Sequence, residues 1–176
     1  MPQRILRVLT EVEINKSIKL SEHMKLGELT VTSVKTADGR SAQGDALLAK
    51  NIPSHVAIEN LKRICGWLEI LRERYNRQYS ADSEIPVLIS SGYRSEQVNM
   101  KCGGAKGSNH LTGCAVDIRC LGPEQMIRYA CLLLDTADEN GWVFDELIQE
   151  KRGTTYWIHF AVRPKDNRRK ILFDCR

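Results

Sequence analysis

The chain has 176 residues, of which 42% are hydrophobic and 27% charged, and its formal net charge is +4 at pH 7. These values are typical of one globular domain and exclude an intrinsically disordered chain, while the mild positive charge does not single out nucleic acid as a partner. No apolar run approaches the roughly 20 residues that span a bilayer, so the sequence predicts no membrane span.

The first half of the chain is expected to hold one long helix. Residues 4–14 favour a strand or an extended arm, residues 20–30 a short helical turn, and residues 33–55 a loop with a turn at Asp38-Gly39. A helix then follows Pro53, because apolar side chains recur every three or four residues. These apolar positions are Ile58, Leu61, Ile64, Cys65, Leu68, Leu71 and Tyr75.

Strands and a second long helix are expected in the next part of the chain. Residues 86–90 are predicted to form a short buried strand entered through a proline, and Ser95 to cap a short helix. Residues 115–120 alternate between apolar and polar side chains, as a half-buried strand does. The second helix is predicted to begin near Pro123 and to stop at Gly141.

The last part of the chain is expected to add further strands and then a tail. Residues 142–149 are apolar enough for a strand although their alternation is broken, and residues 156–162 alternate cleanly. The basic residues 163–170 are expected to be a solvated, frayed end, with a grip on an anionic polymer as the alternative. The expected organisation is an N-terminal arm over 1–19, one main domain over 20–165 and a basic tail over 166–176.

Six cysteines occur in the chain, and none belongs to a Cys-x-x-Cys pair. A thiolate zinc knuckle or a redox motif is therefore not expected. Synthesis in a reducing compartment favours free thiols. A disulfide between Cys102 and Cys114 is the open alternative.

The strongest chemical signal lies in residues 108–119. His110 precedes Asp117 by seven residues with a glycine between them, and His159 lies in the last predicted strand. Two imidazoles and one carboxylate form the kind of zinc set that leaves a position open for water. Asp117 and His159 both stand on the strand face opposite the aliphatic side chains. If the two strands are antiparallel neighbours, both side chains reach one ion, and His110 joins them from a loop.

Several groups of residues follow one another in a recognisable order. They are Ser90-Ser-Gly-Tyr-Arg-Ser95, Asn99, Gly103-Gly104, Ser108-x-His-x-x-Gly-x-Ala-x-Asp117 and Trp157-x-His159. Together they resemble the zinc D-alanyl-D-alanine carboxypeptidase family, which also holds phage-type peptidoglycan peptidases. Residues 20–30 look like the start of a subgroup found in phages and in bacteria that carry prophages.

The resemblance implies an α+β fold in which a small antiparallel β-sheet is backed by helices, as in the amino-terminal domain of the Hedgehog proteins. It also implies that His110, Asp117 and His159 bind one zinc ion, and that Arg94 holds the substrate or its developing oxyanion. The open alternatives are an ordinary ion pair of Asp117 with Arg94 or Arg119, and an Arg94 that only braces its turn.

Further polar residues are assigned roles around this set. Ser91 and Ser108 are expected to hydrogen-bond the substrate or the ligands. Many relatives place a catalytic acid three residues before the last histidine, where this chain has Tyr156. In the subgroup that the chain most resembles, the acid comes earlier. Glu150 is therefore expected to act as the general base, with Glu146 and Asp145 as alternatives.

The expected function is that of a zinc metallopeptidase that hydrolyses bonds next to D-amino acids in peptidoglycan stem peptides. Carboxypeptidase and endolysin-type endopeptidase action both stay open, as do a phage and a host role. The main alternative is a cell-wall-binding module of the same fold without turnover, to which Tyr156 gives weight. A nucleic-acid binder that uses the basic tail is a weaker third hypothesis.

The expected partner is a peptidoglycan stem peptide, with no specific nucleic acid, and a monomer is the default. The first residues lack the uninterrupted apolar core of a secretory signal. We therefore expect synthesis in the cytoplasm without a signal peptide. Action on the cell wall would then follow lysis or holin-type release.

Overall fold

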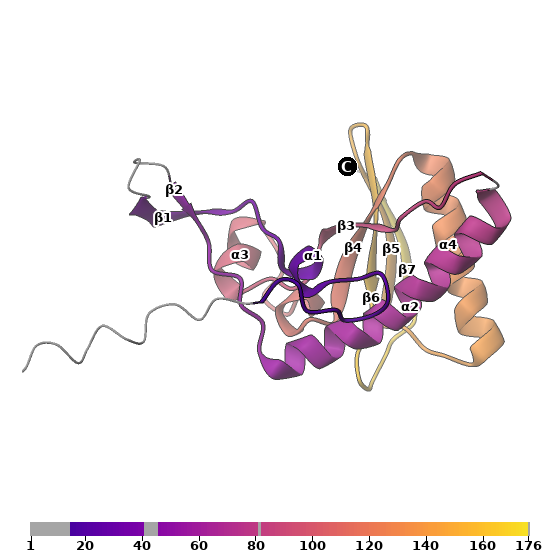
Figure 1. Cartoon of the computed structure of the whole chain (residues 1–176), viewed down its shortest axis with the longest axis horizontal. Coiled ribbons are helices and arrows are strands. Elements are labelled where there is room, and N and C mark those ends of the chain that lie inside the picture. The colour runs from indigo at the N-terminus through magenta and orange to yellow at the C-terminus, as the bar shows by residue number, and fades with distance from the viewer. Residues whose placement is uncertain (1–14, 41–45, 81, 176) are drawn as a thin grey trace, which may run out of the picture.

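The computed structural model describes residues 15–40, 46–80 and 82–175, which form an α+β fold (Figure 1). The helices are α1 (Leu26–Thr30), α2 (His55–Tyr79), α3 (Glu96–Lys101) and α4 (Pro123–Asn140), with a 3₁₀ turn η1 (Asn109–Thr112). The strands are β1 (Lys35–Arg40), β2 (Ala46–Leu48), β3 (Leu88–Ser91), β4 (Ala115–Cys120), β5 (Glu146–Arg152), β6 (Thr155–Ala161) and β7 (Lys170–Cys175). One sheet has the order β3-β4-β6-β5-β7, and β1 pairs with β2 in a second, small sheet.

The hydrophobic core lies between the five-stranded sheet and the two long helices, α2 and α4 (Figure 1). Side chains alternate between the two faces of a strand. Ile118 of β4 and Phe160 of β6 are therefore buried in this core, and Trp67 of α2 meets Phe160 edge-on with ring centroids 5.3 Å apart. Asp117 and His159, which are next to them in the chain, lie on the opposite face.

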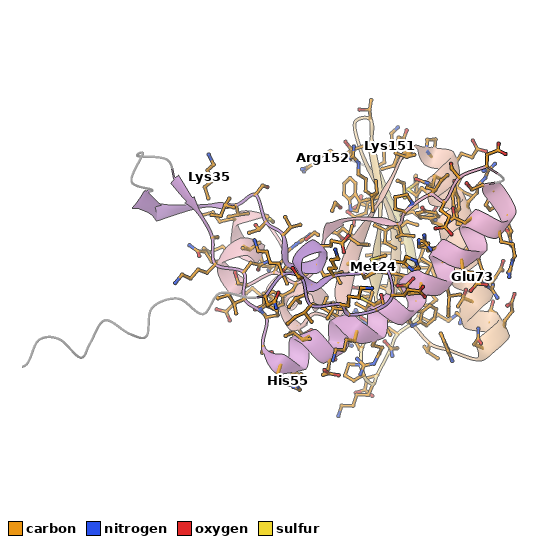
Figure 2. All side chains as sticks on the ribbon, in the orientation of Figure 1. Met24, Lys35, His55, Glu73, Lys151 and Arg152 are labelled. Carbon is orange, nitrogen blue, oxygen red and sulfur yellow. The ribbon has the colours of Figure 1, made fainter. Side chains whose placement is uncertain are left out.

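Both long helices are where the sequence predicts them. In α2 the Ser54 hydroxyl accepts a hydrogen bond from the backbone N–H of Ala57, at 3.2 Å, and so caps the first turn. Helix α4 has Pro123 in its first turn and ends at Gly141, whose φ of 63° is in the left-handed region. Met24, ahead of α1, belongs to the same core (Figure 2).

The predicted pairing of the strand over 115–120 with the strand over 156–162 is confirmed. β4 and β6 are antiparallel neighbours, and Asp117 of β4 is paired with His159 of β6. On its other side β4 pairs with β3, where Ser91 is the partner of Asp117. The short helix predicted after Ser95 is also present as α3, with the Ser95 hydroxyl accepting from the N–H of Val98.

The C-terminal segment departs from the prediction. The α+β class is confirmed, but the sheet is mixed, because β7 runs parallel to β5. A frayed end was expected over the basic residues 163–170, and a tail over 166–176. This expectation is wrong from Lys170 on, because Lys170–Cys175 form β7 and pair with the outer edge of β5. Without β7, the backbone groups along this edge of β5 would have no protein partners.

The strand expected over 142–149 is shifted to Glu146–Arg152.

The N-terminal part also differs from the expected loop. Within residues 33–55, β1 and β2 pair in antiparallel fashion, and Arg40 is the partner of Ala46, so Asp38-Gly39 lies within a strand. Figure 1 shows this small sheet standing away from the five-stranded one. The arm predicted over residues 4–14 lies outside the described residues.

The disulfide considered between Cys102 and Cys114 is absent from the structure. Cys102 is exposed at the end of α3, Cys114 is buried just before β4, and both are free. The disulfide considered between them is therefore not formed.

Candidate metal centre

Three buried side chains converge on the sheet face that the helices leave open. His110 Nε2 lies 3.2 Å from Asp117 Oδ1 and 3.2 Å from His159 Nδ1, and His159 Nδ1 lies 3.1 Å from Asp117 Oδ1. In the described parts of the chain, this is the one group of three or more such side chains able to share a metal ion. The three residues that the sequence proposed as ligands are thus brought together from β4, β6 and η1.

His110 is aimed at the cluster by a hydrogen bond on the far side of its ring. Its Nδ1 lies 2.6 Å from the carbonyl oxygen of Gly92, which leaves Nε2 for the cluster. The Ser108 hydroxyl accepts from the His110 backbone N–H at 3.3 Å and caps η1. Ser108 therefore supports the ligand through the backbone, while its expected contact with substrate stays a prediction.

Two glycines allow the backbone to pack closely around His110. A Cβ on Gly92 would lie 2.3 Å from the carbonyl oxygen of Leu29, and one on Gly113 would lie 2.4 Å from that of Ala57. Gly113 also has a φ of 70°, in the left-handed region that L side chains rarely adopt. The turn between His110 and β4 thus depends on residues without a side chain.

His159 is flanked by carboxylates on both ring nitrogens. Its Nδ1 faces Asp117, and its Nε2 lies 3.4 Å from Glu146 Oε2. Burial alone would lower the pKa of His159, but hydrogen bonds to these two carboxylates outweigh it and raise the pKa to about 9. Burial opposes the charge of Asp117 as well, yet the two histidines hold the pKa of Asp117 well below its usual range.

Asp145 and Glu146, the two alternative bases, are both engaged by cations. Asp145 is fully buried, accepts from the Arg168 guanidinium at 2.7 and 2.8 Å, and accepts from Asn109 Nδ2 at 2.7 Å. These bonds outweigh its burial and lower the pKa of Asp145 to about 2. Glu146 lies 2.9 Å from Arg168, and its bond to His159 is the main cause that lowers its pKa to about 2.

Glu150 has the opposite electrostatic character. It lies on the same face of β5 as Glu146, four residues further along, and is paired with Trp157 of β6. Burial and the nearby charge of Asp117 raise the pKa of Glu150, although a hydrogen bond from Trp157 acts against them. A carboxylate with a raised pKa beside the cluster suits proton transfer better than the two that are tied to Arg168.

Tyr156 cannot supply the acid that many relatives carry three residues before the last histidine. Successive residues of a strand point to opposite faces, so residues 156 and 159 of β6 face different sides. Tyr156 packs against the core, and Lys151 lies over its ring with Nζ 5.7 Å from the centroid. Within β6 the acid would not face the cluster from this position, whereas Glu150 on β5 does.

Arg94 lies at the cluster and contacts Asp117 directly. Its Nε donates to Ser91 Oγ at 2.8 Å, and its Nη2 forms an ion pair with Asp117 Oδ2. Its backbone N–H donates to the carbonyl oxygen of His110 at 3.1 Å. The ion pair that was an alternative for Asp117 is therefore present with Arg94. A role of Arg94 and Ser91 in holding substrate stays a prediction.

Three residues with structural roles at the site were not singled out from the sequence. Asn109, next to His110, donates to both Asp145 and Glu146. Arg168 belongs to the segment that was expected to fray. Asn51 ties the N-terminal segment to the Arg94 turn, because its Nδ2 donates to the carbonyl oxygens of Thr30 and Tyr93 at 2.9 and 2.8 Å. The position of Asn109 beside a proposed ligand was the only available signal.

A cavity of about 1030 Å³ opens over the cluster. Its wall includes His110, Asp117 and His159, and it extends along β5 to Glu150. Lys151 and Arg152 also line it, and Figure 2 shows both at the end of the sheet where β5 turns into β6. The cavity is large enough for a peptide segment.

Two buried imidazoles and a carboxylate, with a second carboxylate of raised pKa beside them, define a metal-dependent hydrolase as the class of protein. The family model for peptidase M15 matches residues 22–142, and the chain belongs to this family of zinc D-Ala-D-Ala carboxypeptidase-like proteins. Membership supports a zinc metallopeptidase in general terms. A search of curated proteins found no match.

The family match ends before β5, so Glu150 and His159 lie beyond it, and the structure is what places them beside His110 and Asp117. None of the helices in the described ranges has the length and apolar content that crossing a membrane requires.

Proposed function

We propose that the protein is a zinc peptidase that hydrolyses peptide bonds next to D-amino acids in peptidoglycan stem peptides. The observation that carries the proposal is the His110–Asp117–His159 cluster with Glu150 on the same face of the sheet. The peptidase M15 membership supports the reaction class. The bond next to a D-amino acid follows from the resemblance of the motifs to D-alanyl-D-alanine carboxypeptidases.

The side chains present fit a zinc ion. Each of the three residues offers one ligand atom, and these atoms lie within 4.8 Å of one another. The other nitrogen of each histidine already has a partner, namely the Gly92 carbonyl oxygen for His110 and Glu146 for His159. This is the usual arrangement of zinc-binding histidines. A zinc ion held there would supply Lewis acidity and lower the pKa of a coordinated water to roughly 7.

Glu150 moves the proton in the proposed reaction. As a carboxylate it accepts a proton from the attacking water, and as the resulting acid it donates that proton to the leaving amine. A raised pKa serves both steps, because the protonated form is then more accessible near neutral pH. Trp157 holds the carboxylate in place through its indole N–H.

Arg94 supplies fixed positive charge at the reacting carbonyl in this proposal. It is partly buried next to Asp117, and its fork can donate to a developing oxyanion or to a substrate carboxylate. Arg152, on the same face of β5 as Glu150 and along the cavity wall, adds positive charge for the carboxylates that stem peptides carry. Ser91 keeps the guanidinium in its plane by accepting from Nε.

A binding module without turnover is the second candidate. Tyr156 gave this hypothesis its weight, because the acid of many relatives is missing at that position. Glu150 on the neighbouring strand offers a substitute, which favours the enzyme.

The test is an assay of purified protein on two substrates. Release of D-alanine from a peptide that ends in D-Ala-D-Ala reports carboxypeptidase action, and cleavage of cross-linked muropeptides reports endopeptidase action. Turnover should vanish with a chelator and return with zinc. Tight zinc binding without turnover on either substrate, at any pH, would establish the binding module instead.

A further inference from the structure

The contacts around Glu146 link one proposed ligand to the C-terminal segment. On one side, Glu146 Oε2 lies 3.4 Å from His159 Nε2. On the other, Glu146 Oε1 lies 2.9 Å from Arg168 Nη2 and 3.6 Å from Lys170 Nζ. Asn109 Nδ2 donates to Oε2 at 3.0 Å. The carboxylate thus contacts four side chains, and its own side chain is only 14% exposed.

The strand register explains why Glu146 points at the histidine ring. Ile148, two residues along the same face of β5, is paired with His159, while Glu146 is paired with Ala161. Diagonal neighbours on one face of an antiparallel pair lie within reach of long side chains. A glutamate at position 146 therefore reaches the far side of the imidazole, away from Asp117.

Arg168 makes this arrangement rigid. Its guanidinium binds Asp145, which is fully buried, through two donors, and the same Nη2 also contacts Glu146. The Arg168 backbone N–H donates to Asp145 as well, at 3.1 Å. The chain enters β7 directly afterwards. The pairing of β7 with β5 therefore holds Arg168 over the two adjacent acids.

We propose that Glu146 is a positioning residue, which accepts the Nε2 proton of His159 and so presents Nδ1 to the ion, and that Arg168 holds Glu146 in place. This inference rests on the proposed zinc site and assigns Glu146 a role other than that of a base. A carboxylate behind a ligating histidine fixes the tautomer and the ring orientation, and losing one lowers metal affinity by about 10- to 100-fold.

The experiment measures zinc affinity by competition with a chromophoric chelator, independently of turnover. Glu146→Ala should weaken zinc binding by about 10- to 100-fold. Glu146→Gln should retain most of the affinity, because its amide oxygen still accepts the Nε2 proton. Arg168→Gln should weaken binding to an intermediate degree. Arg169→Gln is the matched control, since Arg169 pairs with Asp138 of α4, and it should bind zinc like the wild type.

A second readout addresses the tautomer itself. Nitrogen-15 NMR of the zinc-loaded wild type should show His159 protonated at Nε2. The Arg168→Gln variant is expected to fold, because the Arg168 side chain is half exposed. In this variant the signal of the Nε2 proton should be broadened or shifted. Equal zinc affinity of Glu146→Ala and wild type, or a His159 protonated at Nδ1, would overturn the inference. If the wild type binds zinc but does not hydrolyse peptides, only the proposed peptidase activity is refuted. The comparison of zinc affinities among the variants would still test the role of Glu146.

Discussion

Glu150 lies opposite Trp157 in the antiparallel pair of β5 and β6, and the indole of Trp157 donates a hydrogen bond to its carboxylate. The two residues therefore form one unit at the edge of the metal cluster. Glu150 is the group expected to transfer protons, and Trp157 is the group that restrains it. Replacing Glu150 therefore tests the proton carrier, and replacing Trp157 tests the residue that restrains it.

Replacement of Glu150 by glutamine should abolish most turnover without loss of the metal. General acid–base catalysis contributes about 10²- to 10⁴-fold, so kcat should fall by that amount in Glu150→Gln. Zinc affinity should stay that of the wild type, because Glu150 is not among the three clustered residues. The measurement is kcat on the preferred substrate together with zinc content. Glu139→Gln, in an exposed ion pair with Arg74, is the control, and near-normal activity of Glu150→Gln would show that the base is elsewhere.

The pH profile should report the raised pKa of Glu150. As a base it must be ionised, so activity should fall as the pH drops through this pKa, and the acid limb should lie above the usual range of a glutamate. The Trp157 hydrogen bond favours the ionised form. Trp157→Phe should therefore raise the pKa of Glu150 further and shift the acid limb to higher pH. An acid limb that moves to lower pH, or does not move, would contradict the assigned contact.

Gly92 should be intolerant of even a methyl group. Its Cβ would meet the Leu29 carbonyl oxygen at 2.3 Å, and its own carbonyl oxygen holds His110. Overpacking of this kind costs about 1–3 kcal/mol, so Gly92→Ala should lower the free energy of unfolding by that amount and weaken zinc binding. Chemical denaturation and chelator competition measure the two effects.

Gly66→Ala is the matched control for Gly92→Ala. Gly66 lies within α2 and has nothing within 4 Å of an added Cβ. Alanine is favoured over glycine in a helix by up to about 1 kcal/mol, so this variant should be as stable as the wild type or more so, with unchanged zinc affinity. Equal destabilisation of the two variants would refute the steric explanation.

Acid should destabilise the metal-free protein through Asp145. Its pKa in the folded state is about 2, below the ordinary value of 3.8. The ion pair with Arg168 therefore stabilises the fold fully above the unfolded pKa and is lost as the pH falls through the folded pKa. The contribution of Asp145 is about 2 kcal/mol, estimated from the size of that shift. The free energy of unfolding, measured between pH 6 and 2, should decline less steeply in Asp145→Asn, and an equally steep decline would count against this carboxylate.

The sequence predicted the metal centre well because its geometry follows from strand periodicity. Asp117 and His159 lie in strands whose alternation is clean, so the face of each side chain could be read from its neighbours. The adjacency of the two strands was a hypothesis, which the β4–β6 register confirms. His110 was proposed from its residue type and its seven-residue spacing to Asp117, and the resemblance supported it, because a histidine in a glycine-rich loop has no periodicity of its own.

The roles of the three acids between Asp145 and Glu150 could not be read from the sequence. All three are carboxylates within one short segment, and only the register of β5 and the position of Arg168 separate them. Arg168 could not be singled out, because it lies in a basic segment that was predicted to be a solvated end. β7 was missed because its apolar residues, Ile171, Leu172 and Phe173, form a short run without alternation in an edge strand.

The order β3-β4-β6-β5-β7 also has a consequence for the growing chain. During synthesis β4 can pair with β3 at once, but its other edge waits until α4 and β5 have been made and β6 follows. Asp117 acquires the His159 partner only at that stage, and Arg168 comes later still. A nascent chain that has emerged only through α4 would hold two of the three proposed ligands and no Glu150, so it could not hydrolyse a peptide before the last strands are in place.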